Sequence, residues 1–271
     1  MKKNTLNSFK MEKKTVILTG SAGRIGEQFS HALSSAGANV ILVDIEEQKN
    51  QKLEKNLKKL YGTKPMAFST DITDEKQVQA LRQEILKRYS KIDVLINNAH
   101  FSPRTDPNRD SSFENFPLYL WEKTVNPNLK SIFLCSKEIG KTMAKQKKGV
   151  IVNISSIYGL IGADQRIYGK TKLNSPAHYA TVKGGIVNLT RYLAAYWGDK
   201  NIRVNTLTLG GMFDKKLHQD KKFVKNYENK TILGRMGKSD DYDGAILFLT
   251  SDASKYLTGA NIVVDGGWTA W

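Results

Sequence analysis

Short apolar runs alternate with longer amphipathic segments along most of the chain. The run Thr-Val-Ile-Leu-Thr at 15–19 is apolar and β-branched, which is typical of a buried strand, and apolar residues then recur at helical spacing through 25–36. The same pattern predicts the remaining strands at 39–43, 65–70, 93–96, 150–154, 202–206 and 261–264. It predicts the remaining helices at 46–60, 74–89, 118–146, 178–197 and 240–250.

This alternation indicates the fold class, because short crossovers between parallel strands are right-handed and pack helices onto the sheet. We expect an α/β protein with a single Rossmann-type doubly wound domain and a seven-stranded, mainly parallel sheet. The domain should span residues 14–271 and follow a basic N-terminal extension at 1–13. The charged segment 212–235 is expected to form a flexible lid over the substrate.

A glycine-rich turn, Thr-Gly-Ser-Ala-Gly-Arg-Ile-Gly at 19–26, joins the first strand to the first helix. Glycines let the backbone approach a pyrophosphate, and the free N–H groups at a helix start attract its negative charge. Asp44 ends the second strand, where an acid is positioned to bind ribose hydroxyls. Such a glycine pattern also occurs in ordinary turns, but this one opens a chain of alternating strands and helices. The sequence therefore predicts a dinucleotide site.

Tyr179 and Lys183 are spaced to share one face of the predicted helix that continues through Gly184 and Ala194. An ammonium near a phenol favours the ionised form of that phenol. This is the property that a general acid and base needs in alcohol oxidation or ketone reduction. Tyr179 and Lys183 are thus our candidate proton-transfer pair.

A second tyrosine and lysine, Tyr168 and Lys172, have the same spacing. They are followed by Gly169 and Pro176, which break helices, so the pair lacks the helical geometry that brings the two side chains together. We interpret residues 163–178 as an insertion that overhangs the substrate pocket.

With these residues in hand, the chain resembles the short-chain dehydrogenase/reductase family from about Lys14 to its carboxyl end. Several further segments resemble motifs of that family and occur in its order: Thr70-Asp71-Ile72, Asn97-Asn98-Ala99, Asn128-Leu129, Val150–Ser156, Val204–Gly211 and Gly259–Gly267. The resemblance implies catalytic roles for Asn128, Ser156, Tyr179 and Lys183. It implies cofactor contacts from Gly20, Ser21, Gly23, Arg24, Ile25, Gly26, Asp44, Asp71, Ile72, Asn98, Ala99, Tyr179, Lys183, Gly210, Gly211 and Met212.

Two choices within these motifs rest on register. Either Asn126 or Asn128 could be the relay asparagine, and we choose Asn128 because it directly precedes Leu129. The neighbouring Pro127 should kink the helix there. Of the two serines that end the fifth predicted strand, we choose the second, Ser156.

Departures from the family pattern raise further alternatives. Arg24 replaces a glycine, and its side chain either lies over a cofactor phosphate, which would suit NADP, or faces solvent in the first turn. Asp44 opposes a 2′-phosphate, so we expect NAD rather than NADP. His100 also replaces a glycine and either contacts substrate or is a structural loop residue. Leu209 stands where many relatives have proline.

Composition changes this picture little. The net charge of +16 admits a nucleic-acid-binding protein, but the lysines are spread over helix faces rather than grouped with aromatic residues on one stripe. We therefore expect no nucleic-acid partner. No apolar run reaches the length of a membrane span, and the first residues lack the apolar core of a signal peptide, so we expect a cytoplasmic protein without a membrane partner. Met11 is an alternative start.

The cysteine and histidine residues give no sign of a metal site. Cys135 is the single cysteine and lies in an apolar run, and the four histidines have no ligand spacing. We expect no metal. By resemblance, the chain should form a homodimer or homotetramer.

Substrate identity rests on resemblance to bacterial flagellin-modification and polysaccharide-biosynthesis oxidoreductases. That subgroup implies a phosphorylated or nucleotide-linked sugar, and Arg166, Lys170 and Lys172 of the insertion could hold its anionic group or form a solvated loop. Two alternatives stay open. One is a 3-oxoacyl thioester reductase, and the other is a cofactor-sensing regulator without catalytic activity.

Overall fold

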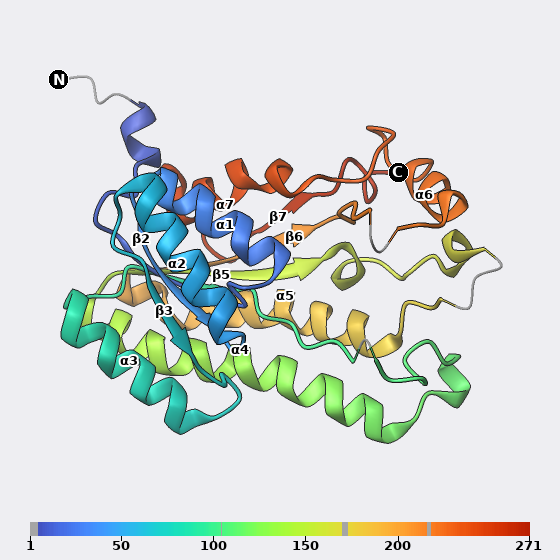
Figure 1. Cartoon of the computed structure of the whole chain (residues 1–271), viewed down its shortest axis with the longest axis horizontal. Coiled ribbons are helices and arrows are strands. Elements are labelled where there is room, and N and C mark those ends of the chain that lie inside the picture. Colours follow the sequence, from blue (N-terminus) through green and yellow to red (C-terminus); the bar gives the residue numbers. More distant parts are fainter. Residues whose placement is uncertain (1–4, 104, 170–172, 216–217) are drawn as a thin grey trace.

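The structure is a computed structural model, and it describes residues 5–271 except 104, 170–172 and 216–217. Seven strands form one sheet in the order β3-β2-β1-β4-β5-β6-β7, and every neighbouring pair is parallel (Figure 1). The strands are β1 Thr15–Thr19, β2 Asn39–Asp44, β3 Met66–Ser69, β4 Val94–Asn97, β5 Gly149–Ser156, β6 Ile202–Leu209 and β7 Asn261–Val264. The predicted seven-stranded parallel sheet is confirmed.

Helices cover both faces of this sheet (Figure 1). They are α1 Arg24–Ser35, α2 Glu47–Tyr61, α3 Glu75–Tyr89, α4 Leu118–Gln146, α5 Ala177–Trp197, α6 Lys221–Glu228 and α7 Asp243–Thr250. Val16 and Leu18 of β1 belong to the core beneath α1, α2 and α7, whereas Ile17 belongs to the core beneath α3, α4 and α5. The alternation follows from the two-residue period of a strand, and it explains why a strand buried on both faces is apolar throughout.

The order of the strands reverses at β1. From β1 the chain adds β2 and β3 on one side of the sheet, then returns to place β4 against the other side of β1. In open parallel sheets, ligands bind in the crevice that this reversal opens at the carboxyl ends of the strands. The topology therefore positions a site beside the ends of β1 and β4.

Several boundaries differ from those the sequence predicts. The segment 212–235 contains α6, a regular helix, and the predicted helix at 240–250 is a 3-10 turn followed by α7. Met11 is fully buried in the core and its N–H donates to the carbonyl of Ala36, so the packed domain begins before residue 14. Among the described residues, no helix has both the length and the apolar character needed to cross a membrane.

Candidate active site

A cavity of about 1040 Å³ lies at the carboxyl edge of the sheet. The glycine turn after β1 and the loop after β6 line it, and Asp44 lies in its wall with Tyr179 and Lys183. All predicted cofactor-binding residues except Ser21 belong to this lining. Ser21 is fully buried and its hydroxyl donates to Oδ1 of Asn50 at 2.7 Å, which fixes the turn from behind.

The glycine turn is shaped for close backbone approach. Gly20 adopts φ +67°, and a Cβ at this position would lie 2.7 Å from the Cα of Ala99. At Gly26, a Cβ would lie 2.1 Å from the carbonyl oxygen of Gly20. Because no larger residue fits either position, the turn keeps its N–H groups next to the cavity. This backbone geometry fits a dinucleotide pyrophosphate.

Asn98 holds the turn in place from β4. Its Nδ2 donates to the carbonyl oxygens of Thr19 and Gly20 at 3.0 and 3.1 Å. The Thr19 hydroxyl in turn accepts the N–H groups of Asn98 and Ala99. Asn98 therefore supports the cofactor site by fixing its backbone.

Asp44 lies beside the same turn at the end of β2. Its Oδ2 accepts the N–H of Ala22 at 2.9 Å, and its Oδ1 accepts the N–H of Glu46 at 3.1 Å. These bonds fix the carboxylate at the cavity wall, where it can accept hydrogen bonds from ribose hydroxyls. In the loop after β3, Asp71 accepts both the N–H and the hydroxyl of Thr73, so this loop is also ordered.

Arg24 is exposed in the first turn of α1, as the second alternative has it, and its guanidinium also has fixed partners. Its Nη1 and Nη2 donate to the carbonyl oxygens of Phe213 and Met212 at 3.0 and 3.1 Å, and Nη1 pairs with Oδ2 of Asp214 at 2.8 Å. The guanidinium is therefore held by the segment after β6. No local sequence pattern reveals this partner, because nearly 190 residues separate the two segments.

Ser156, Tyr179 and Lys183 come together from two neighbouring elements. Ser156 ends β5, and its side chain hydrogen-bonds that of Tyr179 on α5. One helical turn later, Lys183 places its Nζ 5.8 Å from the centroid of the Tyr179 ring and 3.2 Å from the carbonyl oxygen of Ile154. The predicted helical face therefore exists, and it meets the end of β5.

Burial dominates the acid–base properties of this pair. Burial raises the pKa of Tyr179, against an opposing effect of its hydrogen bond with Ser156. Burial also lowers the pKa of Lys183 to about 8. The pKa of Tyr179 is raised overall, because loss of water outweighs its hydrogen bond with Ser156. That the Lys183 ammonium favours the phenolate stays a prediction.

The two register choices can be compared with the geometry. The hydroxyl of Ser155 donates to the carbonyl oxygen of Lys183 at 2.9 Å, so it supports α5, while Ser156 contacts Tyr179. Asn126 is exposed, whereas Asn128 is buried and lines the cavity.

The Asn128 amide is fully engaged in holding the loop after β4. Its Oδ1 accepts the N–H of Phe101, and its Nδ2 donates to the carbonyl oxygens of Phe101 and Thr124, at 2.7 to 2.9 Å. The helix α4 continues past Pro127, so the expected kink does not interrupt it. Since proline has no N–H, Pro127 cannot satisfy the carbonyl of Lys123, and both residues line the cavity.

The remaining part of the cavity, where a substrate would meet Tyr179, is rich in aromatic residues. Tyr158, Tyr168, Phe223 and Tyr227 line it. A hydrogen bond joins the side chains of Tyr158 and Tyr168, and the Tyr168 ring stacks on that of Phe223 with centroids 5.5 Å apart. Sequence reasoning missed Tyr158, Phe223 and Tyr227 because they lie in short, non-periodic segments or on a helix predicted as irregular lid.

The predicted basic contacts are not supported by the described residues. Arg166 is exposed and forms a two-pronged ion pair with Asp164, with N–O distances of 2.7 and 2.9 Å, and it does not line the cavity. Lys170 and Lys172 lie outside the described residues. Their insertion nevertheless contributes Ile167 and Tyr168 to the cavity wall.

His100, for which the sequence left two alternatives, lies at the cavity beside Tyr179. The two ring centroids are 5.2 Å apart and the planes are nearly perpendicular, at 82°. This edge-to-face geometry is typical of favourable aromatic pairs. His100 therefore packs on the proposed acid–base residue and lines the cavity as well.

The fold and this site define a dinucleotide-dependent oxidoreductase. A family model described as enoyl-(acyl carrier protein) reductase matches residues 20–269. The chain belongs to the short-chain dehydrogenase/reductase family, as its motifs predict. Among curated relatives, it is 32% identical to a 3-oxoacyl-[acyl-carrier-protein] reductase of Thermotoga maritima, over 95% of this chain and 98% of that protein. It is 31% identical to post-translational flagellin modification protein A of Campylobacter coli, over 95% of this chain and 99% of that protein.

Solved structures agree with this assignment. A short-chain dehydrogenase from Leptospira borgpetersenii with bound NAD+ is 34% identical, with a TM-score of 0.83 over 99% of this chain and 97% of that one. A gluconate 5-dehydrogenase from Burkholderia cenocepacia, in complex with NADP and tartrate, is 27% identical, with a TM-score of 0.87 over 99% and 100%. The family thus includes similar proteins that bind each form of the cofactor.

Replacement of Tyr179 by phenylalanine should lower kcat by about 10²-fold or more, as the loss of a general acid and base does. The matched variant Tyr168→Phe keeps the stacked ring and should lower kcat far less. Steady-state kinetics of both variants test this assignment. A larger loss of kcat in Tyr168→Phe would move the proton-transfer role to the insertion.

Replacement of Lys183 by methionine should raise the free energy of unfolding at pH 7. The lowered pKa of Lys183 means that folding disfavours its ammonium form, by roughly 1–3 kcal/mol after the lost hydrogen bond to Ile154 is subtracted. This advantage should be complete below pH 8, where the folded protein is protonated, and should disappear as pH rises towards 10.5. Urea unfolding at pH 7 and pH 9.5 measures it.

Lys55→Met, at an exposed position of α2, provides the control. Its effect on stability should be the same at both pH values. An advantage of Lys183→Met that grows with pH, or a loss of stability at pH 7, would contradict the burial penalty.

Proposed function

We propose that this protein transfers hydride between NAD and a secondary alcohol or ketone, with a sugar derivative as its substrate. The observation that carries the proposal is the convergence of Ser156, Tyr179 and Lys183 in the cavity whose wall also holds Asp44. Acid–base groups at one end and a ribose acceptor at the other suit a nicotinamide dinucleotide that extends between them.

In this proposal, the bound cofactor supplies or accepts the hydride. The Tyr179 hydroxyl donates a proton to the ketone oxygen during reduction, and its phenolate accepts the proton of the alcohol during oxidation. Ser156 binds the same oxygen, since its side chain already hydrogen-bonds Tyr179. Lys183 places a positive charge near the phenol when it is protonated, and Asn128 keeps the loop after β4 beside the reacting groups.

A preference for NAD follows from the charge at the adenosine end. Asp44 is fixed at the cavity wall by two backbone N–H groups, so its carboxylate cannot easily turn away from a 2′-phosphate. Arg24, the basic residue within the glycine turn, already pairs with Asp214 and donates to two carbonyl oxygens. The NAD-bound relative from Leptospira borgpetersenii supports this preference, and the NADP-bound gluconate 5-dehydrogenase is the precedent against it.

A sugar derivative suits the substrate end. Tyr158, Tyr168 and Tyr227 offer hydroxyls together with ring faces, and this combination binds the polar and apolar surfaces of a sugar. Similarity to a flagellin modification protein and a gluconate dehydrogenase also supports this class. We propose a phosphorylated or nucleotide-linked form used in surface-glycan synthesis, for which the exposed Lys123 at the cavity is the described candidate cation.

Assembly is part of the same proposal. Tyr192 and Tyr196 of α5 are each about 60% exposed and stack on one another, and Phe133 of α4 is 54% exposed. Large apolar groups on adjoining helices suit an interface between copies of the chain. We propose a homodimer or homotetramer that works in the cytoplasm.

The substrate class can be tested with four probes and both cofactors, by following absorbance of the reduced nicotinamide. Fructose 6-phosphate, UDP-N-acetylglucosamine, sorbitol and acetoacetyl-CoA represent phosphosugars, nucleotide sugars, neutral polyols and acyl thioesters. We expect the highest kcat/KM with one of the two anionic sugars. Preference for acetoacetyl-CoA would favour a 3-oxoacyl thioester reductase, and cofactor binding without turnover of any probe would favour the sensing regulator.

The cofactor preference generates a separate prediction about Asp44. NAD should bind about fivefold or more tightly than NADP, because two like charges about 4 Å apart cost roughly 1 kcal/mol even in water. Asp44→Asn keeps a side-chain oxygen that can accept a backbone N–H and removes the negative charge. It should therefore reduce the difference in affinity between NAD and NADP. Titration of both cofactors by fluorescence measures this, and tighter NADP binding by the parent protein would contradict the assignment.

A further inference from the structure

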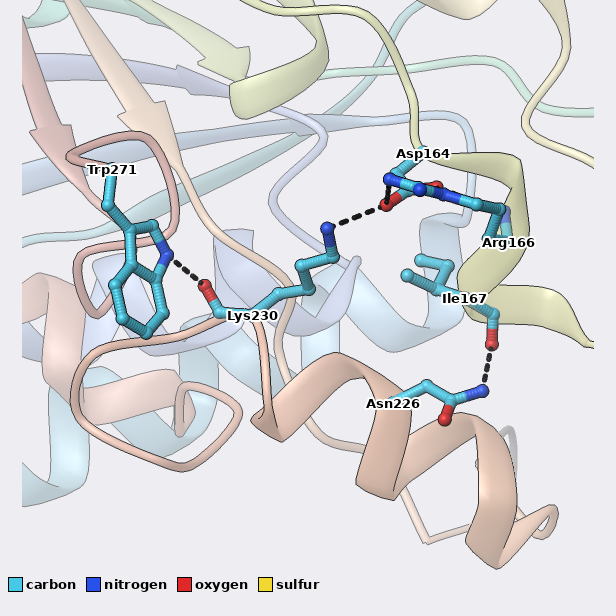
Figure 2. Close-up of polar contacts among 6 residues, drawn as sticks. All are labelled: Asp164, Arg166, Ile167, Asn226, Lys230 and Trp271. Atoms are coloured by element: carbon cyan, nitrogen blue, oxygen red, sulfur yellow. Dashed lines mark hydrogen bonds and ion pairs between the residues drawn. The ribbon is translucent and has the colours of Figure 1, made fainter.

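Polar contacts join the insertion to α6, although the two segments are far apart in the sequence (Figure 2). Asp164 accepts from Nζ of Lys230 at 2.8 Å as well as from Arg166. Nδ2 of Asn226 donates to the carbonyl oxygen of Ile167 at 3.0 Å. The bonds of Lys230 and Asn226 connect the described start of the insertion, 163–169, to α6 or to the residues that follow it.

Apolar packing joins the same segments from the inside. Ile167 is only 3% exposed and belongs to a cluster with Tyr227, Met236 and Trp268. The stacked pair of Tyr168 and Phe223 continues this cluster into the cavity. The insertion start and α6 therefore share one small core and one set of polar contacts.

The carboxyl end of the chain completes the unit. Nε1 of Trp271 donates to the carbonyl oxygen of Lys230 at 3.0 Å (Figure 2). Trp268 packs on Tyr227 with ring centroids 4.3 Å apart. The backbone carbonyl of Lys230 is thus held by Trp271, while the ammonium of Lys230 pairs with Asp164.

Tyr168 is the residue through which this unit reaches the reacting groups. Its side chain hydrogen-bonds Tyr158, and the Tyr158 ring lies 6.4 Å from that of Tyr179. Ser175, beyond the undescribed residues, also hydrogen-bonds the Tyr168 side chain. The Tyr168 side chain is therefore held at its hydroxyl and on one ring face, and it forms part of the wall that a substrate would touch.

We propose that Tyr168 is a specificity-determining residue that contacts the substrate, and that the Asp164–Lys230 ion pair is the device that positions it. This inference rests on the proposed function for the substrate contact, whereas the coupling of the insertion to α6 does not. The insertion and α6 act as a single wall of the pocket. A substrate must then fit both segments together, which selects for a rigid ring that packs against Tyr168 and Tyr158.

The proposal gives Asp164 a structural task that its charge suits. Arg166 and then Lys230 hold the pKa of the Asp164 carboxyl well below its usual range, so it stays ionised at working pH. Exposed ion pairs contribute little to stability. Asp164 is only 17% exposed, however, and the pair acts together with a hydrogen bond and a shared core. Loss of the Asp164 charge is therefore expected to raise KM for the substrate moderately.

The coupling can be tested without any substrate by hydrogen–deuterium exchange of the whole protein. Asp164→Asn keeps an acceptor for the Arg166 N–H and removes the ion pair with Lys230. It should speed exchange in peptides covering both 163–169 and 221–230. The matched control is Asp199→Asn, which removes an exposed ion pair with Lys200 on the loop after α5 and should leave both peptides unchanged. Faster exchange in only one of the two segments would overturn the coupling.

The contact with substrate is tested by kinetics with whichever of the four probes has the highest kcat/KM. Tyr168→Leu should raise KM by about tenfold, and Asp164→Asn by about threefold, with NAD affinity and kcat changed less than twofold. In the double variant KM should not exceed that of Tyr168→Leu alone, because both changes remove one interaction. An unchanged KM in Tyr168→Leu, or effects that multiply, would overturn the proposal.

The two failures can be told apart. If no probe is turned over, the proposed function fails and the substrate role of Tyr168 fails with it, while hydrogen exchange still decides the coupling. If a probe is turned over and KM does not respond to Tyr168→Leu, the proposed function stands and only the role of Tyr168 is wrong.

Discussion

The common direction of the seven strands is the constraint on which the rest of the structure depends. Because every strand is parallel to its neighbours, all carboxyl ends share one edge of the sheet. Asp44 ends β2, Asn98 directly follows β4, Ser156 ends β5 and Gly210 directly follows β6. Residues separated by more than a hundred positions in the chain are thereby brought into one cavity, and the helices mainly fix their orientation.

That arrangement buries an amine, Lys183, beside a phenol, Tyr179, which is energetically unfavourable for the amine. Lys183 is 5% exposed and its Nζ donates to the Ile154 carbonyl, so the folded protein keeps a group that would be better solvated in water. Around it, the cofactor loop and the substrate wall are connected. The Tyr227 hydroxyl of α6 accepts the N–H of Gly211, and Arg24 holds the carbonyl of the next residue, Met212. Two hydrogen bonds therefore connect Tyr227 in the substrate wall with Arg24 in the glycine turn, by way of the loop after β6.

The sequence predicts what depends on local pattern. The seven strands are recognisable because each is a short apolar run. Tyr179 can be distinguished from Tyr168 because a helical pattern follows Tyr179 and none follows Tyr168. In the structure, Tyr168 is the last residue of a 3-10 turn and precedes Gly169, which has φ +58°. The partners of long side chains are predicted poorly from the sequence. Arg24 reaches a partner that no local pattern reveals, and the rise in the pKa of Tyr179 depends on burial, which is a property of the whole fold.

A crystal structure of the protein with NADH would test the central claim, that one cavity at the carboxyl edge brings the cofactor to Tyr179. The account predicts the adenosine ribose hydroxyls at the Asp44 carboxylate, the pyrophosphate along the turn from Gly20 to Gly26, and the nicotinamide ring beside Tyr179. A dinucleotide whose ribose lies away from Asp44, or whose nicotinamide lies away from Tyr179, would contradict it.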